Sequence, residues 1–282
     1  MTAAAIARRR LGLSGYAICL AGIGARELLR FVHQRERFLA ALVRPLVWLF
    51  IFAAGFRNVL GVSIIPPYET YVLYEVYVTP GLAVMIQLFN GMQSSLSMVY
   101  DREVGSMRVL LTSPFPRWSL LFAKLVAGVA VSLIQVYVFL AVAGLMEVDV
   151  PPAGYLSALP AFMLAGLMLG AIGLFLSSLV RQLENFASVM NFVIFPMFFA
   201  SSALYPLWRI RESSEPLYLV CLANPFTHAV ELVRHALYGS FEPTAFTVAA
   251  ATTVAFFILA ALAYDPGRGL MARRGGPKEE AQ

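Results

Sequence analysis

Long apolar stretches recur along this chain, and each is close to the length of a helix that crosses a lipid bilayer. A hydrocarbon core roughly 30 Å thick takes about 20 helical residues, and backbone groups left unpaired there are costly. With 60% hydrophobic and 13% charged residues, the 282-residue chain lacks the polar surface of a soluble globule. We therefore expect an all-α polytopic membrane protein with six transmembrane helices. They cover about residues 38–56, 78–99, 119–146, 155–179, 186–205 and 245–264.

Positive side chains are unevenly distributed between the expected loops. If the N-terminus is cytoplasmic, that side receives eight of the 21 Lys and Arg residues up to Arg44, four between Arg102 and Lys124, Arg181, and four in the C-terminal tail. Short cytoplasmic loops carry such an excess in membrane proteins. Both termini are therefore expected in the cytoplasm. The basic residues are interpreted as topology signals and contacts to membrane lipid, with no nucleic acid as a partner.

Residues 26–37 mix apolar and basic side chains in the manner of an amphipathic helix. We expect this helix to lie in the membrane interface. The predicted organisation is a cytoplasmic tail with this interface helix over 1–37, a six-helix domain over 38–264 and a second cytoplasmic tail over 265–282.

The second predicted span is unusually polar. Gln87, Asn90 and Ser94 fall at helical spacings, so one side of this helix is expected to face other helices or a cavity. These three residues are candidates for lining a transport pathway. The alternative is that they make hydrogen bonds between helices and have no contact with substrate.

A charged break follows the second span. Asp101, Arg102 and Glu103 mark the exit from the bilayer, and residues 104–111 can form a short helix that includes Arg108 before Pro114 stops it. A short helix held between two spans can pass a push from a soluble partner into the membrane. The alternative is an ordinary solvated loop.

Three segments resemble the ABC-2-type permeases, the membrane subunits of ATP-binding-cassette exporters. One is the acidic, glycine-containing segment between the second and third spans, and another is ALYPLW at 203–208. The third is NPFTHAVELVRHALYG, with Asn224, Pro225 and Arg234 before the last span. The matching positions of the first segment are Glu103, Gly105, Leu110, Leu111, Pro114 and Arg117.

The resemblance implies a permease that moves a hydrophobic, amphipathic or lipid-linked substrate out of the cytoplasm or inner leaflet of the plasma (inner) membrane. It also implies a dimer of two permease copies. Each copy would dock on a nucleotide-binding ATPase subunit at a coupling helix over 101–114. Short re-entrant outer helices are implied over 206–240. The ATPase-coupling residues are then Asp101, Arg102, Glu103, Gly105, Arg108, Leu110, Leu111, Pro114 and Arg117.

The residues themselves agree with a separate ATPase. A phosphate-binding loop needs a glycine-rich turn that ends in Lys and Ser or Thr, and neither Lys124 nor Lys278 lies in such a turn. No cofactor is therefore expected in this chain, and ATP and Mg are assigned to the partner subunit.

Other functions are less consistent with the sequence. No histidine lies in a predicted span beside an acid and a nucleophile, so no catalytic residues are assigned. His228, Glu231 and His235 have a spacing that fits zinc, but no fourth ligand is evident and no metal is expected. The alternative function is a stand-alone ion- or proton-coupled secondary transporter, although ionisable residues are scarce in the spans.

Overall fold

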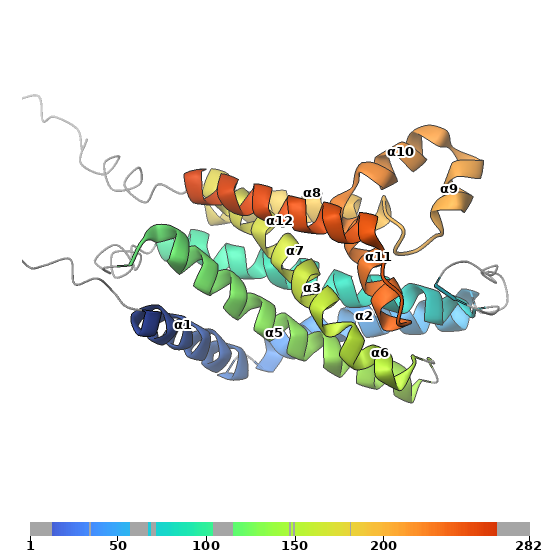
Figure 1. Ribbon diagram of the computed structural model, residues 1–282, viewed down its shortest axis with the longest axis horizontal. Coiled ribbons are helices and arrows are strands. Elements are labelled where there is room, and N and C mark those ends of the chain that lie inside the picture. Colours follow the sequence, from blue (N-terminus) through green and yellow to red (C-terminus); the bar gives the residue numbers. More distant parts are fainter. Residues whose placement is uncertain are drawn as a thin grey trace, which may run out of the picture.

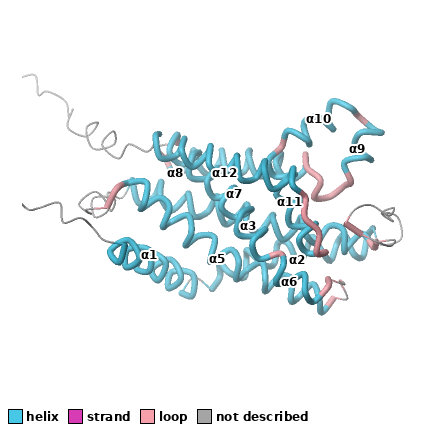
Figure 2. The backbone as a smooth tube through the Cα atoms, viewed as in Figure 1, coloured by secondary structure: helices cyan, strands magenta, loops and turns pink. Residues whose placement is uncertain are grey.

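The computed structural model describes residues 13–33, 35–56, 67–68, 72–103, 115–146, 148, 150–180 and 182–263. The backbone is helical through nearly all of these ranges, as the tube in Figure 2 shows. The expected all-α fold is confirmed for this part of the chain. Its helices are α1 (Leu13–His33), α2 (Arg35–Phe56), α3 (Tyr74–Glu103), α5 (Arg117–Leu145), α6 (Pro152–Ser157), α7 (Leu159–Leu179), α8 (Leu183–Phe199), α9 (Leu207–Ser213), α10 (Glu215–Ala223), α11 (Pro225–Leu237) and α12 (Pro243–Ala263).

A helix lies at each of the six predicted spans. Among the described residues, α5, α7 and α12 are long and apolar enough to cross a membrane. Shorter apolar helical segments lie in α2, over Ala41–Ile51, and in α8, over Ser188–Phe199. Helix α3 is 30 residues long, but its polar side chains lower its hydropathy. The structure thus supports a membrane protein with at least these three apolar helices, and six crossings stay a prediction.

Helix α7 lies at the centre of the bundle, between α3 and α12 (Figure 1). Its glycines allow a close approach to α3, because a Cβ atom on Gly91 would lie 3.0 Å from the backbone nitrogen of Gly170. A Cβ atom on Gly173 would lie 2.7 Å from Ser95 Oγ. Glycines on both helices therefore permit close packing of α3 on α7.

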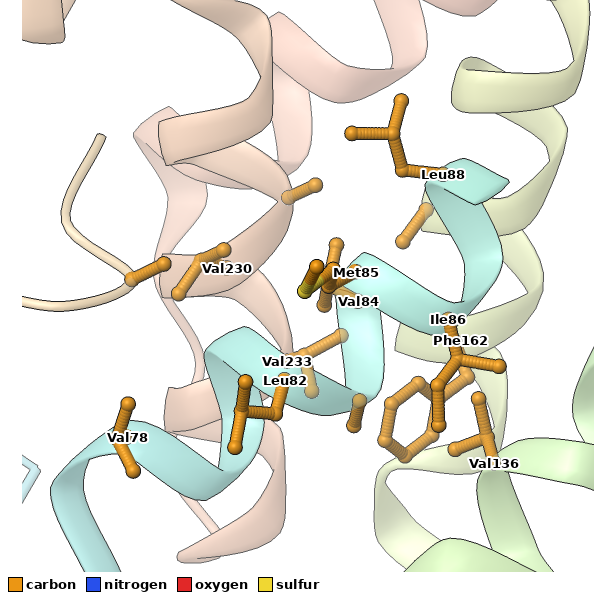
Figure 3. Close-up of a cluster of buried hydrophobic side chains, with 14 of the residues drawn as sticks. Val78, Leu82, Val84, Met85, Ile86, Leu88, Val136, Phe162, Val230 and Val233 are labelled. Carbon is orange, nitrogen blue, oxygen red and sulfur yellow. The ribbon is translucent and has the colours of Figure 1, made fainter. Parts of the chain in front are cut away.

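The main hydrophobic core surrounds the first half of α3. Figure 3 shows Leu82 and Met85 of α3 between Val230 of α11 on one side and Phe162 of α7 on the other. All four side chains are almost fully buried. Because these contacts join segments far apart in sequence, α3, α7 and α11 pack as one unit.

The N-terminal helix differs from the prediction. A helix was expected over 26–37, but α1 begins at Leu13, ends at His33 and packs along α5 (Figure 1). The weak helix formers Gly22 and Gly24 have no neighbouring atom within 4 Å of an added Cβ. Helix α1 nevertheless continues through both glycines.

Candidate functional site

The segment between α8 and α12 folds into short helices, in the region where outer helices were expected. Helices α9 and α10 form a hairpin that projects from the bundle, while α11 packs against α3, α7 and α12 (Figure 1). Helix α8 ends at Phe199, before the predicted limit of 205. The chain then turns through residues 200–206 into α9. Two polar side chains that the sequence singled out, Asn224 and Arg234, hold this arrangement together.

Asn224 joins the end of α8 to the start of α11. Its Oδ1 accepts a hydrogen bond from the backbone N–H of Phe226, which caps α11, at 3.0 Å. Its Nδ2 donates to the carbonyls of Met197 and Ala200, at 2.7 and 2.6 Å. These carbonyls lie at the end of α8, where no further helical turn can satisfy them. Pro225 occupies the first turn of α11, a position that does not require its missing N–H.

Arg234 is a buried cation at the centre of a polar cluster. Its side chain is 2% exposed and forms an ion pair with Glu231, one turn earlier on α11, at 2.5 Å. Its Nη2 donates to the carbonyl of Ser202 at 2.9 Å, and its guanidinium lies over the Tyr77 ring at 4.1 Å. The Tyr77 hydroxyl donates to the same Ser202 carbonyl at 2.9 Å. The arginine therefore connects α11, the turn after α8 and the start of α3.

The surroundings of Arg234, here called the arginine cluster, keep this arginine charged and keep the neighbouring Tyr68 neutral. Burial by itself disfavours the charged guanidinium, but the Glu231 carboxylate holds the pKa of Arg234 above its ordinary value. Burial raises the pKa of the neighbouring Tyr68 to about 12, because a phenolate would lose its hydration. Among the described residues, Tyr68 Oη, Ser202 Oγ and Arg234 Nε are buried without a hydrogen-bond partner.

The two histidines of α11 contact backbone carbonyls. His228 Nε2 lies 2.9 Å from the carbonyl oxygen of Leu222, and His235 Nδ1 lies 2.9 Å from that of Glu231. In the part of the chain that the structure describes, no group of three His, Cys, Asp or Glu side chains could hold a metal ion. His228 thus contacts the end of α10, and His235 contacts its own helix.

The polar side chains of α3 divide between packing and a cleft. Gln87 is buried and its Nε2 donates to the carbonyl of Phe162 on α7, at 2.8 Å. Asn90, one turn later, donates to the Gln135 side chain of α5. Asn90 and Ser94 border a cleft of about 80 Å³, and Ser94 and Gln87 border a neighbouring cavity of about 10 Å³. The expectation that one side of this helix faces other helices or a cavity is confirmed.

Helix α1 closes the other side of the cleft. It contributes Glu27 and Arg30, and α3 adds Gln93 to Asn90 and Ser94. Nothing in the sequence assigned Glu27, Arg30 or Gln135 to this site. The helical spacing of Glu27, Arg30 and Phe31 indicated that they share one face of a helix. Only the fold shows that this face borders the same cleft as α3.

Most of the predicted coupling segment lies outside the described residues. The backbone of Asp101, Arg102 and Glu103 forms the last turn of α3. Gly105, Arg108, Leu110, Leu111 and Pro114 fall in the part that the structure does not describe. Arg117 is exposed and begins α5. The ring of Phe115, just before it, contacts the ring of Tyr16 on α1, with centroids 5.4 Å apart.

Comparison with known proteins agrees with this architecture. Residues 20–238 match the family model described as ABC-2 type transporter. The chain is 28% identical over 217 residues to the "Putative transport permease ycf38" of Porphyra purpurea, which covers 74% of this chain and 70% of that protein. It is 31% identical over 166 residues to the "Probable multidrug ABC transporter permease YbhR" of Escherichia coli K12, which covers 57% of this chain and 43% of that protein. The family model spans most of the chain, and the protein therefore belongs to the ABC-2 type transporter family of membrane permeases.

Proposed function

We propose that this permease is the membrane subunit of an ABC exporter and works as a homodimer, with ATP and Mg bound by a separate ATPase subunit. In this proposal the chain crosses the plasma (inner) membrane six times with both termini in the cytoplasm. Its substrate is hydrophobic, amphipathic or lipid-linked. The name of the YbhR relative, a probable multidrug permease, is consistent with an apolar or amphipathic substrate.

The observation that carries the proposal is the polar cleft between α1, α3 and α5. Polar groups left unpaired within an apolar bundle are costly unless they contact water or a ligand. Asn90 and Ser94 line this cleft and are proposed to line the pathway, with Gln87 one turn away on α3. Gln87 Oε1 is buried without a hydrogen-bond partner among the described residues.

We assign the ATPase contact to residues 101–114, with Arg117 beside them. Two long helices, α3 and α5, flank this segment directly, so a displacement of the segment moves both walls of the cleft. The contact between Tyr16 and Phe115 joins α1, the third wall, to the same place. A displacement of residues 101–114 by the ATPase would therefore act directly on α1, α3 and α5.

A reconstitution with charge reversals tests this proposal. The permease and its ATPase are purified together, placed in lipid vesicles, and assayed for association and for ATP-driven transport of a fluorescent amphiphile. Glu103→Lys combined with Arg108→Glu should lower both readouts while leaving membrane insertion intact. The matched control is Arg211→Glu combined with Glu212→Lys on the exposed face of α9, which should change neither.

Two results would contradict the proposal. Unchanged transport in the Glu103 and Arg108 double variant would remove the coupling assignment. Transport driven by an ion gradient, with the ATPase absent, would favour the secondary transporter.

A further inference from the structure

The cleft combines both charges with uncharged hydrogen-bonding groups. Glu27 and Arg30 of α1 face Asn90 and Gln93 of α3 across it. Its volume of about 80 Å³ is several times the roughly 10–15 Å³ that one ordered water needs. Neither the Gln93 side chain nor Asn90 Oδ1 has a hydrogen-bond partner within the described ranges. The cleft therefore has both the room and the free polar groups to hold a small polar ligand.

Glu27 and Arg30 are only loosely paired with each other, and the closer partner of Glu27 is Arg26. Arg30 Nη1 lies 3.8 Å from Glu27 Oε2, and its side chain is 35% exposed. Glu27 is 12% exposed and also contacts Arg26 Nη2 at 3.3 Å. At 3.8 Å, the Arg30 guanidinium makes no hydrogen bond to the carboxylate. A ligand with a phosphate and an ammonium group could give each of these side chains a shorter, charge-assisted contact.

The sides of α1 that face away from the cleft are apolar. On α1, Leu28, Leu29 and Val32 are 44%, 59% and 55% exposed, on the sides of the helix that the cleft does not use. Val43 on α2 is 52% exposed. A ligand whose polar group enters the cleft would thus keep its hydrocarbon chains along α1, in contact with exposed apolar side chains.

We propose that this cleft binds a phosphoethanolamine group, with the phosphate on Arg30, the ammonium on Glu27 and hydrogen bonds to Gln93 and Asn90. Its role in transport rests on the proposed function. It deepens that function by identifying the headgroup of an amphiphile that enters between α1 and α3. Glu27 would repel an anionic headgroup that lacks an amine. Arg30 would repel a cationic amphiphile that lacks a phosphate.

Photo-crosslinking of the full-length protein in phosphatidylcholine vesicles tests this site without the ATPase. The probe is a phosphatidylethanolamine with a diazirine next to the acyl carbonyl, and labelled peptides are identified by mass spectrometry. Peptides of α1 and α3 should carry most of the label. Arg30→Gln and Glu27→Gln should each lower that label about tenfold, the loss expected for one charge-assisted hydrogen bond. Gln93→Leu, which changes no charge, should lower it as well.

The controls separate the headgroup from other sources of binding. Arg211→Gln, on exposed α9, should leave the label unchanged. A phosphatidylglycerol probe with the same diazirine should label the cleft several-fold less. Competition by soluble glycerophosphoethanolamine would show that the group binds without its chains, whereas its failure to compete would assign the ligand to the lipid. Folding of each variant is checked by its melting profile in detergent.

Two outcomes would overturn the inference. One is equal labelling of wild type and the Arg30 and Glu27 variants, and the other is equal labelling by both lipid probes. Failure of the proposed function is distinct from these results, because labelling needs no ATP. If the cleft is labelled as expected while ATP-driven transport is absent, the site stands and the exporter assignment fails.

Discussion

The guanidinium carbon of Arg234 lies 4.1 Å from the centroid of the Tyr77 ring, and the two residues are separated by most of the chain. Tyr77 is fully buried and Arg234 is 2% exposed. The same guanidinium pairs with Glu231 and donates to the Ser202 carbonyl. The contact fixes α11 against the start of α3 in a region that lies apart from the polar cleft.

Loss of this arginine should destabilise the fold. Arg234→Met keeps the length of the side chain but leaves Glu231 without its cation and the Ser202 carbonyl with Tyr77 as its remaining donor, at a cost of about 3 kcal/mol. Thermal unfolding in detergent, followed by circular dichroism, should show a lower midpoint. Arg209→Met, at an exposed position of α9, should cost less than about 0.5 kcal/mol. Equal midpoints for the two variants would show that the cluster adds nothing to stability.

The two ends of the Asn224 side chain should have separable effects. Asn224→Ala removes the cap of α11 and both contacts to the end of α8, for a loss of about 2 kcal/mol. Asn224→Asp keeps the capping oxygen but cannot donate to the Met197 and Ala200 carbonyls, so it should also destabilise. Ser214→Ala removes a cap whose hydrogen bond is long, 3.5 Å, and should have a smaller effect in the same assay. An Asp variant as stable as wild type would show that the contacts to α8 are dispensable.

Close packing of α3 on α7 should make Gly173 intolerant of substitution. A Cβ atom there would lie 2.9 Å from the Gly91 carbonyl oxygen, which is backbone and cannot move alone. Gly173→Ala should therefore cost about 1–3 kcal/mol. Gly22→Ala has open space around it and should be neutral or stabilise α1 by up to about 1 kcal/mol. The melting midpoints of both variants test this, and the reverse order would contradict the α3–α7 contact.

Alkaline pH should weaken the arginine cluster. Because burial raises the pKa of Tyr68 to about 12 from its ordinary value near 10, the folded state holds this proton more tightly than the unfolded chain does. The resulting stability is complete below pH 10 and is lost as the pH rises toward 12. Tyr68→Phe should reduce the fall in the unfolding midpoint over this interval, while at neutral pH it should change stability little. The same alkaline loss in wild type and variant would contradict the role of Tyr68.

The sequence was sufficient for the features that depend on local pattern. Apolar stretches of bilayer length predicted the positions of α5, α7 and α12. The polar spacing on α3 predicted a cavity or helix contact, and both are present. These features arise within one helix, where periodicity alone decides which face is polar or small.

Contacts between distant segments could not be predicted in this way. Arg234 was predicted to lie in the outer region before the last span, and its burial depends on Tyr77 and Ser202, which the sequence does not place beside it. Glu27 and Arg30 were assigned to a helix in the membrane interface, but their polar face meets α3 and α5. In both places the partner of a charged residue is set by the tertiary packing of other helices.

The proposed coupling to the ATPase requires that residues 101–114 lie on the cytoplasmic side of the membrane. In a chain with Cys19→Ser and Cys221→Ala, a cysteine is introduced by Ser106→Cys or, as the outer reference, by Ser213→Cys on α9. Intact cells and permeabilised cells are then treated with a membrane-impermeant maleimide. With the proposed topology, Ser106→Cys should be labelled only after permeabilisation and Ser213→Cys should be labelled in intact cells. Labelling of Ser106→Cys in intact cells would place the proposed coupling segment outside, where no cytoplasmic ATPase can reach it, and would contradict the account.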